Sequence, residues 1–422
     1  MSNSSAKRLL LLSNVFNNFG QGVTMITIPM YFSSIAETNM FSVCYFLVTL
    51  VTLFWTPFAG MLVDKYKRQS IFILINLVCA ICLSIFCVAG SVYSGLMPYA
   101  AASAFAVIFW NYGIYYTCFY SFLQEILKPQ EYGQIAKTIE IQAQFSSGIA
   151  AALAGFLFAG SCFEFTDWFN FGICFPKLSI ATILGVNAGI FFITCFMISR
   201  MRYEKQTTQE KETGTISERL KTGLVWLLDN KPLMWFGIHS FGVFTIIIIG
   251  CFLLFPMYIS NHLAVPASSF SIFELFYSTG AMTAGFLIQR LFGWTTNIKA
   301  IILLTFVSVL MCFYLVFNDT VLVLYLVGFL LGITNAGIRV LRMSYLFTVL
   351  PNWVSGRVNS LFALSNVIVR LFFSAIFSIP FFHAGNHVIY AFMILAIYVF
   401  LSAVGMYLLR NRLISETIQL SE

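Results

Sequence analysis

Residues 57–93 read PFAGMLVDKYKRQSIFILINLVCAICLSIFCVAGSVY, a charged turn followed by a long apolar segment. The apolar part, residues 71–93, contains no Lys, Arg, Asp or Glu. It is long enough to cross a membrane as a helix, because a bilayer core of about 30 Å takes about 20 apolar residues. Apolar segments separated by short charged turns are typical of multi-pass membrane proteins.

The composition agrees with this interpretation. The chain has 422 residues, of which 59% are hydrophobic and 9% are charged, and its 47 Phe outnumber 23 Lys and Arg plus 16 Asp and Glu. Soluble domains carry about 25% charged residues because their surfaces face water. This composition excludes an ordinary soluble enzyme and predicts a surface that faces lipid.

Twelve segments are long and apolar enough to span the membrane. We therefore expect an all-α membrane protein whose twelve helices form two six-helix bundles related by pseudo-two-fold symmetry. The expected spans are 9–33, 40–63, 71–93, 97–124, 138–160, 178–199, 233–260, 268–289, 300–317, 321–348, 357–381 and 388–409. The first span is too long for the apolar region of a cleavable signal peptide, so we expect it to remain as a helix.

Lys and Arg predict the orientation, since cytoplasmic loops retain positive charge during insertion. Nearly all lie in even-numbered loops or at the two ends of the chain. The exceptions are Lys177 in an outer loop and three Arg within spans, Arg339, Arg342 and Arg370. This pattern predicts cytoplasmic termini in a bacterial inner membrane. The net charge of +7 then reflects topology, and no clustered basic face indicates nucleic-acid binding.

A polar stretch divides the chain. We expect an N-terminal bundle at 1–199, a cytoplasmic linker at 200–231 and a C-terminal bundle at 232–422. Within the linker, Leu220, Leu224, Leu227 and Leu228 recur at helical spacing and predict an amphipathic helix at the inner membrane face. The two halves also resemble each other weakly, as in two-bundle transporters with a midplane substrate site.

The charged turn carries the most specific motif. Gly60, Leu62, Asp64, Lys65 and Arg68 match the pattern G-x-L-x-D-R-x-G-R, with Lys65 in place of the first Arg, whereas Lys67 replaces the second Gly. An acid beside a basic cluster at the membrane face predicts a gate lock that breaks and re-forms. The proposed gate residues are Gly60, Asp64, Lys65, Arg68, Glu125 and Glu140.

In this motif the chain resembles the major facilitator superfamily. The stretches 218–236, 253–260, 273–287 and 355–365, which include LLFPMYIS and FELFYSTGAMTAGFL, are similar to its macrolide-efflux and siderophore-export branch. The resemblance implies a monomeric, proton-coupled exporter of small molecules that works by alternating access. Two departures leave an importer open: residues 148–160, GIAAALAGFLFAG, lack the Pro of many antiporters, and Gln289 replaces the Asp of a second motif copy.

Charged side chains at membrane depth are expensive, so those that are kept usually face a partner or a cavity. Arg370 is near the middle of its span, Arg339 lies deeper than Arg342, and Glu274 lies about two turns from the outer surface. The guanidinium groups of Arg339 and Arg370 suit a carboxylate-bearing substrate, and Glu274 suits proton coupling. The alternative is that these groups pair structurally with one another or with backbone carbonyls.

Polar side chains on the first and fourth spans form a second candidate surface. Asn14, Asn17, Asn18 and Gln21 recur every three or four residues, and so share one helix face. Asn111 and Tyr115 do the same on the fourth span. We expect Asn17, Asn18, Gln21, Asn111 and Tyr115 to contact substrate; the alternative is packing between helices.

Cys162 and Cys174 are disulfide candidates, because both lie in a predicted outer loop. A pair of free thiols is the alternative, and the other eight Cys lie in apolar spans. His383 and His387 are spaced for a metal, but without a nearby carboxylate we expect no metal and no cofactor.

The sequence thus predicts a secondary transporter of a small, anionic organic molecule, with protons as coupling ion and lipid as surroundings. An importer of a nutrient or metal–siderophore complex, a multidrug or macrolide pump and a non-transporting receptor are the alternatives. An enzyme is not expected, since no nucleophile–base pair or phosphate-binding Gly loop is present.

Overall fold

The computed structural model describes residues 3–127, 132–165, 171–204, 216–266 and 268–419. Within these ranges the chain is almost entirely helical, and every expected span overlaps a long helix or helical run. Nine of these helices are long and apolar enough to cross a membrane. Helices α1, α4 and α5 fall outside that set in the described part of the chain, and α1 and α4 carry the two polar stripes.

The chain folds into two compact units. Unit 1 comprises residues 1–212 and 265–275, and unit 2 comprises residues 213–264 and 276–422. Helix α11 (Ser268–Leu291) begins in unit 1 and continues into unit 2.

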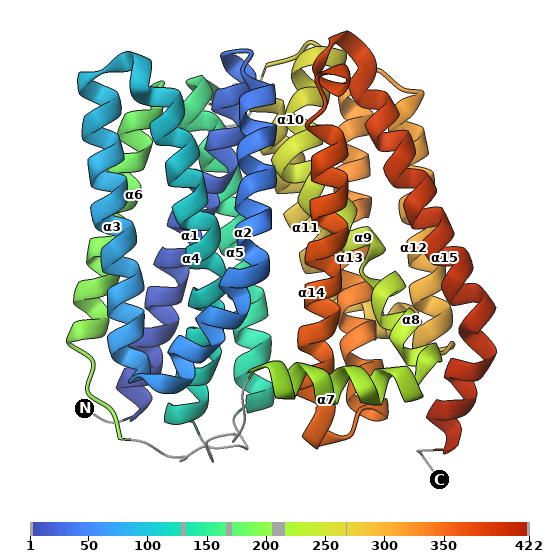
Figure 1. Cartoon of the computed structure of the whole chain (residues 1–422). Coiled ribbons are helices and arrows are strands. Elements are labelled where there is room, and N and C mark those ends of the chain that lie inside the picture. Colours follow the sequence, from blue (N-terminus) through green and yellow to red (C-terminus); the bar gives the residue numbers. More distant parts are fainter. Residues whose placement is uncertain (1–2, 128–131, 166–170, 205–215, 267, 420–422) are drawn as a thin grey trace. The chain divides into compact units, whose positions relative to one another are not determined.

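Unit 1 is a bundle of long helices (Figure 1). They are α1 (Asn3–Ser34), α2 (Thr38–Lys65), α3 (Arg68–Val92), α4 (Met97–Ile126), α5 (Tyr132–Ala159) and α6 (Ile180–Ser199). A one-turn helix, η1 (Ser94–Leu96), joins α3 to α4. Helix α1 contacts α2, α4, α5 and α6, so the polar face of α1 is surrounded by its own bundle.

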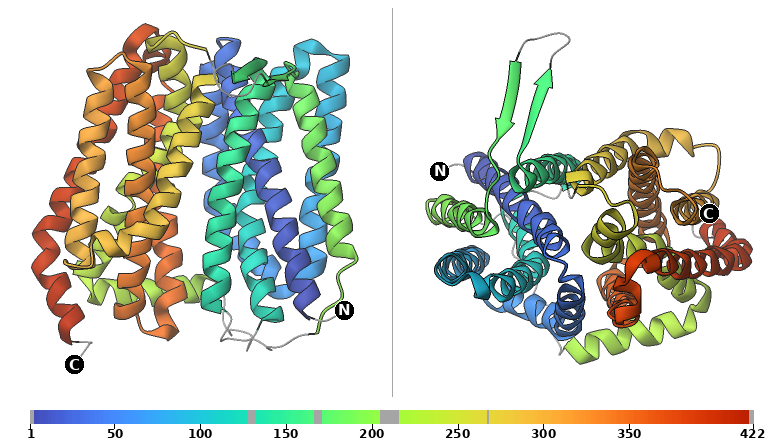
Figure 2. Two further views of the ribbon diagram at one scale, coloured as in Figure 1. Left: turned by 180° about the vertical axis from the view of Figure 1, so that it is seen from behind. Right: turned by 90° about the horizontal axis from the view of Figure 1, so that it is seen from above.

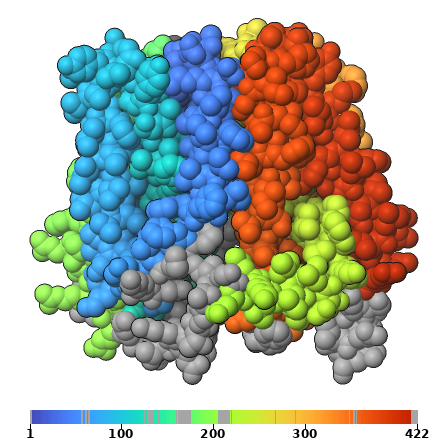
Figure 3. All heavy atoms as spheres, in the orientation of Figure 1, coloured from blue at the N-terminus to red at the C-terminus, as the bar shows by residue number. Residues whose placement is uncertain are grey.

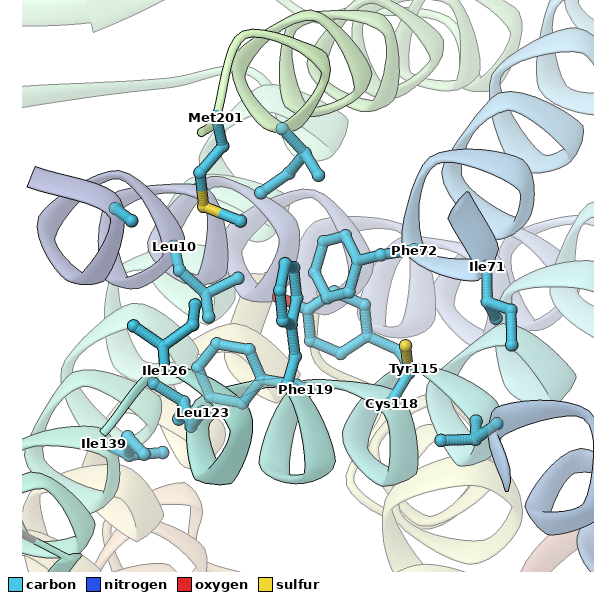
Figure 4. Packing of buried hydrophobic residues seen from close by; sticks show 14 of the residues in the cluster. Leu10, Ile71, Phe72, Tyr115, Cys118, Phe119, Leu123, Ile126, Ile139 and Met201 are labelled. Atoms are coloured by element: carbon cyan, nitrogen blue, oxygen red, sulfur yellow. The ribbon is translucent and has the colours of Figure 1, made fainter. Parts of the chain in front are cut away.

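Aromatic side chains fill the core of unit 1 where α1, α3 and α4 meet (Figure 4). The Tyr115 ring lies 4.9 Å from that of Phe72 and stacks on Phe119 at 5.9 Å. Such pairs add about 0.5–1.5 kcal/mol beyond their buried area. The core thereby fixes α4 against α1 and α3, which positions the polar residues of α1.

A β-hairpin that the sequence did not predict joins α5 to α6 (Figure 2, right). Strand β1 (Ser161–Phe165) pairs antiparallel with β2 (Phe171–Phe175), and Cys162 lies opposite Cys174. Gly160 enters β1 with φ of 70°, a conformation that favours glycine. The segment is short and lies between two strong helical patterns, so its own pattern gave no clear strand signal.

Unit 2 contains the remaining helices (Figure 1). They are α7 (Ile216–Asp229), α8 (Lys231–Ser240), α9 (Gly242–Ile249), η3 (Gly250–Leu254), α10 (Phe255–Met257), η4 (Tyr258–His262), the rest of α11, α12 (Asn297–Val316), α13 (Val321–Val349), α14 (Asn352–Phe377), η5 (Pro380–His383), η6 (Gly385–His387) and α15 (Val388–Gln419). Pro351 separates two helices, since α13 ends at Val349 and Pro351 caps α14.

The span from Lys231 to His262 is a broken helix. The segments η3 and η4 have π-helical hydrogen bonding on either side of Pro256. Proline has no N–H and its ring clashes with the carbonyl four residues earlier, so the helix widens locally. π-Helical turns of this kind are frequent at functional sites.

Helix α7 crosses the beginning of α14 and packs against it within unit 2 (Figure 3). Gly223 permits this approach, since a Cβ there would lie 3.0 Å from the Cβ of Arg357. Leu227 is buried, whereas Leu224 and Leu228 are about half exposed. The helix therefore has one face for α14 and a second apolar face that suits the membrane surface.

Candidate functional site

Arg68, one of the predicted gate residues, pairs with Glu125 where α3 begins and α4 ends in unit 1. Arg68 begins α3 and Glu125 lies in the last turn of α4, and their Nη1 and Oε2 atoms are 3.1 Å apart. The Glu125 side chain is 2% exposed and that of Arg68 is 17% exposed. Both side chains are largely removed from water, so each charge helps to compensate the other.

Tyr203, just beyond α6, completes this cluster. Its hydroxyl donates a hydrogen bond to the Glu125 carboxylate. Burial, and then the negative charge of Glu125, raise the pKa of Tyr203 to about 12, so the phenol stays protonated and keeps donating. Nearby, Gln69 donates to the Ile198 and Met201 carbonyls at 2.9 Å. The beginning of α3 is thus tied to the ends of both α4 and α6.

The other gate candidates lie on the same side of unit 1. Gly60, Asp64 and Lys65 are in the last part of α2, and Glu140 is in α5. Their side chains lie outside the described residues, so the structure brings together only Arg68 and Glu125 of the predicted gate.

The amides of α1 form a buried hydrogen-bond chain. Gln21 donates to Asn17, Asn17 donates to Asn76 of α3, and Asn76 donates to the Phe72 carbonyl. A buried polar group without a partner costs about 1–3 kcal/mol, so this chain holds α1 against α3. Asn17 is therefore committed to structure through both its amide oxygen and its nitrogen.

The tyrosines of α4 engage the same face of α1. Tyr115 donates to Asn14 at 3.1 Å, and Tyr116 donates to Asn18 at 3.0 Å. Tyr115 is fully buried in the aromatic core, which makes it a structural residue. The Tyr116 ring lies 4.8 Å from that of Tyr112, which is about half exposed.

Several amide atoms on this face have no hydrogen-bond partner among the described residues. They are Asn14 Nδ2, Asn18 Nδ2, Gln21 Oε1 and both polar atoms of Asn111. Asn18 and Gln21 lie on α1 and Asn111 lies on α4. Unit 1 therefore keeps unused hydrogen-bond donors and acceptors on these two helices, and we call Asn18, Gln21 and Asn111 the amide face.

Sequence reasoning missed three polar residues of this architecture. Asn76 lies on α3 and Asn187 lies on α6. Both are buried, and Asn187 donates to Thr24 of α1. An Asn within a span that has no charged residue could have indicated a buried hydrogen bond between helices. His262, at the end of η4, has its Nε2 2.8 Å from Asp319 Oδ1.

In unit 2, Arg370 lies in the interior. It is on α14, its exposure is 9%, and its Nε has no hydrogen-bond partner among the described residues. One turn earlier, Asn366 donates to Thr245 of α9 at 2.8 Å. Arg370 thus stands on a polar strip of α14 with hydrogen-bonding capacity left over.

The two Arg of α13 differ from Arg370. Arg342 is buried and donates to the Ser240 carbonyl at 2.9 Å, with its guanidinium 3.6 Å from the Phe241 ring centroid. It therefore links α13 to the junction of α8 and α9. Arg339 is half-buried and already has an interaction partner.

Glu274 lies in the part of α11 that belongs to unit 1. It is in the first turns of that helix, is buried, and takes part in an interaction with another residue. This part of α11 packs closely within unit 1, since a Cβ on Gly155 would lie 2.2 Å from Ser271 Oγ.

His383 and His387, whose spacing would suit a metal, each lie close to a backbone carbonyl. His383 Nε2 lies 2.9 Å from the Phe377 oxygen, and His387 Nδ1 lies 3.0 Å from the Phe381 oxygen. No group of three or more metal-ligating side chains occurs among the described residues.

Solved structures share this fold at low sequence identity. A bacterial homologue of the iron transporter ferroportin, in an inward-facing state, has a TM-score of 0.71 and 14% identity, covering 97% of this chain and 99% of its own. The nucleoside transporter NupG gives 0.69 and 13%, covering 96% and 98%. A D-xylose–proton symporter gives 0.67 and 11%, covering 94% and 96%.

No curated protein sequence matches the chain significantly. The family model of the Major Facilitator Superfamily matches residues 10–374. The resemblance seen in the Asp64 turn is thereby confirmed at the level of the superfamily, and the protein is a multi-pass membrane transporter. The chain belongs to the Major Facilitator Superfamily.

Proposed function

We propose that the protein is a secondary transporter that exports a small organic anion, such as a polycarboxylate of the siderophore type, by proton-coupled alternating access. Buried Arg370 carries this proposal, since its Nε has no partner among the described residues. A buried guanidinium without compensation is costly. A carboxylate would supply that compensation, because the planar guanidinium matches its geometry and stays charged at all relevant pH.

The other intramembrane Arg support a narrower site than the sequence predicted. Arg342 is committed to the Ser240 carbonyl and to the Phe241 ring. Arg339 already has a partner. We therefore assign the anion to Arg370 and keep Arg339 as a secondary candidate.

The amide face of unit 1 is a separate candidate for contact with a substrate. Asn18, Gln21 and Asn111 keep unused donors and acceptors, whereas Asn17 and Tyr115 are engaged within the bundle. Hydroxyl or amide groups of a ligand would satisfy these atoms. Neutral amides form weaker hydrogen bonds to an anion than a guanidinium does, so we expect the amide face to contribute less to anion affinity than Arg370.

Proton coupling is assigned to Glu274, because ionisable residues in membrane spans commonly serve proton relays. Arg68, Glu125 and Tyr203 are proposed as the inner lock of unit 1. The macrolide and siderophore branch, the direction of transport and the inner-membrane location stay predictions.

Ligand-dependent thermal stabilisation of the purified protein tests the anion site. Polycarboxylates and lipophilic cations would be compared on the wild type, Arg370→Gln and Arg370→Lys, with exposed Arg412→Gln as the matched loss of charge. We expect carboxylates to stabilise the wild type and the control. Arg370→Gln should weaken binding by about 10- to 150-fold, since a hydrogen bond to a charged group contributes about 1.5–3 kcal/mol. Stabilisation of the wild type by cations alone would overturn the proposal and favour a multidrug pump.

Flux in proteoliposomes tests coupling and direction. Glu274→Gln should keep anion binding but lose the dependence of flux on an imposed pH gradient. Full retention of that dependence would remove Glu274 from coupling. Movement of the anion in the same direction as the protons, and not in the opposite direction, would identify an importer.

A further inference from the structure

We propose that Cys162 and Cys174 form an intramolecular disulfide across the β1–β2 hairpin, a modification independent of the transported substrate. The strands pair with Ser161 opposite Phe175, so Cys162 and Cys174 face each other one step from the base of the hairpin. The side chains of both strands lie outside the described residues, and the backbone register carries the pairing.

The base of the hairpin fixes this register. The Leu178 N–H donates to the Leu157 carbonyl at 2.7 Å, which closes the end of α5 onto the segment before α6. Gly160 and Lys177 approach so closely that a Cβ on Gly160 would lie 2.8 Å from the Lys177 Cβ. The two ends of the hairpin are therefore held together, close to Cys162 and Cys174.

Directly opposed residues of an antiparallel pair have the separation that a disulfide needs. Their Cα atoms are about 4.5 or 5.5 Å apart, depending on the type of pair. A disulfide joins Cα atoms about 4.4–6.8 Å apart. Opposed side chains also lie on the same face of the hairpin, whereas a slip of one residue would put the two Cys on opposite faces.

The remaining cysteines provide the contrast. All eight lie in helical segments and are free thiols in the structure. Cys79 and Cys82 have C-x-x-C spacing, but both are within α3, and Cys79 is buried. The hairpin pair differs because it lies outside the spans, in a loop that the charge pattern predicts to face an oxidising compartment.

Formation of the bond requires an oxidant, which we identify by class as the disulfide of a thiol–disulfide oxidoreductase. The thiolate of one Cys attacks that disulfide, forms a mixed disulfide and releases one oxidoreductase thiolate. The thiolate of the second Cys then attacks the hairpin sulfur of the mixed disulfide. The oxidoreductase leaves as a dithiol with both electrons, and the two protons of the hairpin thiols balance its two thiolates.

Labelling of the full-length protein in intact cells tests the proposal. A membrane-impermeant maleimide would be applied before and after an impermeant reductant, and labelled peptides would be identified by mass spectrometry. We expect no label on Cys162 or Cys174 before reduction and label on both afterwards. Cys162→Ser should leave Cys174 reactive without reduction, whereas Cys79→Ser should leave the wild-type pattern unchanged.

Three results on the wild-type chain would overturn the proposal, whatever the variants do. Labelling of both Cys without reductant would show free thiols. If neither Cys162 nor Cys174 is labelled after reduction, the hairpin does not face the oxidising compartment. A reductant-sensitive dimer on a non-reducing gel, with a Cys162–Cys174 link between two chains, would exclude the intramolecular bond.

Discussion

Removal of the Glu125 carboxylate should destabilise unit 1, because it breaks the ion pair that Glu125 forms with the largely buried Arg68. The two side chains are 2% and 17% exposed, and the charged atoms are 3.1 Å apart. The pair joins residues 57 positions apart in the chain and connects α3 to α4. The perturbation is Glu125→Gln, which keeps the shape of the side chain and an oxygen that can accept from Tyr203.

The expected loss follows from the distance and the burial. At 3.1 Å and an effective dielectric constant of about 20, the gross Coulomb attraction is about 5 kcal/mol. Desolvation offsets much of this in the intact pair, but truncation of one partner of a buried pair costs about 3–5 kcal/mol. Because Arg68 keeps some contact with solvent, we expect about 3 kcal/mol for Glu125→Gln.

A double-mutant cycle on the purified protein measures this loss. Unfolding in mixed micelles would be compared for the wild type, Glu125→Gln, Arg68→Gln and the double variant. We expect a coupling energy of at least about 1 kcal/mol, so that the double variant loses less than the sum of the two single variants. Single losses below about 0.5 kcal/mol with no coupling would refute the buried-pair reasoning.

Two further predictions concern unit 2. Gly332→Ala should lower the free energy of unfolding by about 1–3 kcal/mol, because its Cβ would clash with a backbone carbonyl oxygen of α11. Gly285→Ala, whose Cβ would meet nothing within 4 Å, should be neutral or slightly stabilising. Equal losses of stability in the two variants would contradict this packing. Burial lowers the pKa of His383 below 6.5, opposed by its hydrogen bond to a backbone carbonyl, so the unfolded chain binds the extra proton first. The stability from neutral His383 is therefore complete above about pH 6.5 and is lost as the pH falls below it, and thermal unfolding against pH should become flatter in His383→Gln.

The sequence by itself determined the architecture. Apolar segments of membrane-spanning length and the Asp64 turn fixed the fold class, because span length and the positions of charges are local properties. The existence of α7 followed from the helical periodicity of its leucines, which is also a local property.

Only the tertiary structure decided which polar groups are already used. Sequence treated Arg339 and Arg370 alike, and predicted Asn17 and Tyr115 as substrate contacts. In the folded chain, Arg342 is bound to the Ser240 carbonyl and Asn17 is paired with Asn76, while Arg370 keeps an unpaired Nε among the residues that the structure describes. These outcomes depend on helices that are distant in the sequence and packed by shape, so no local pattern encodes them.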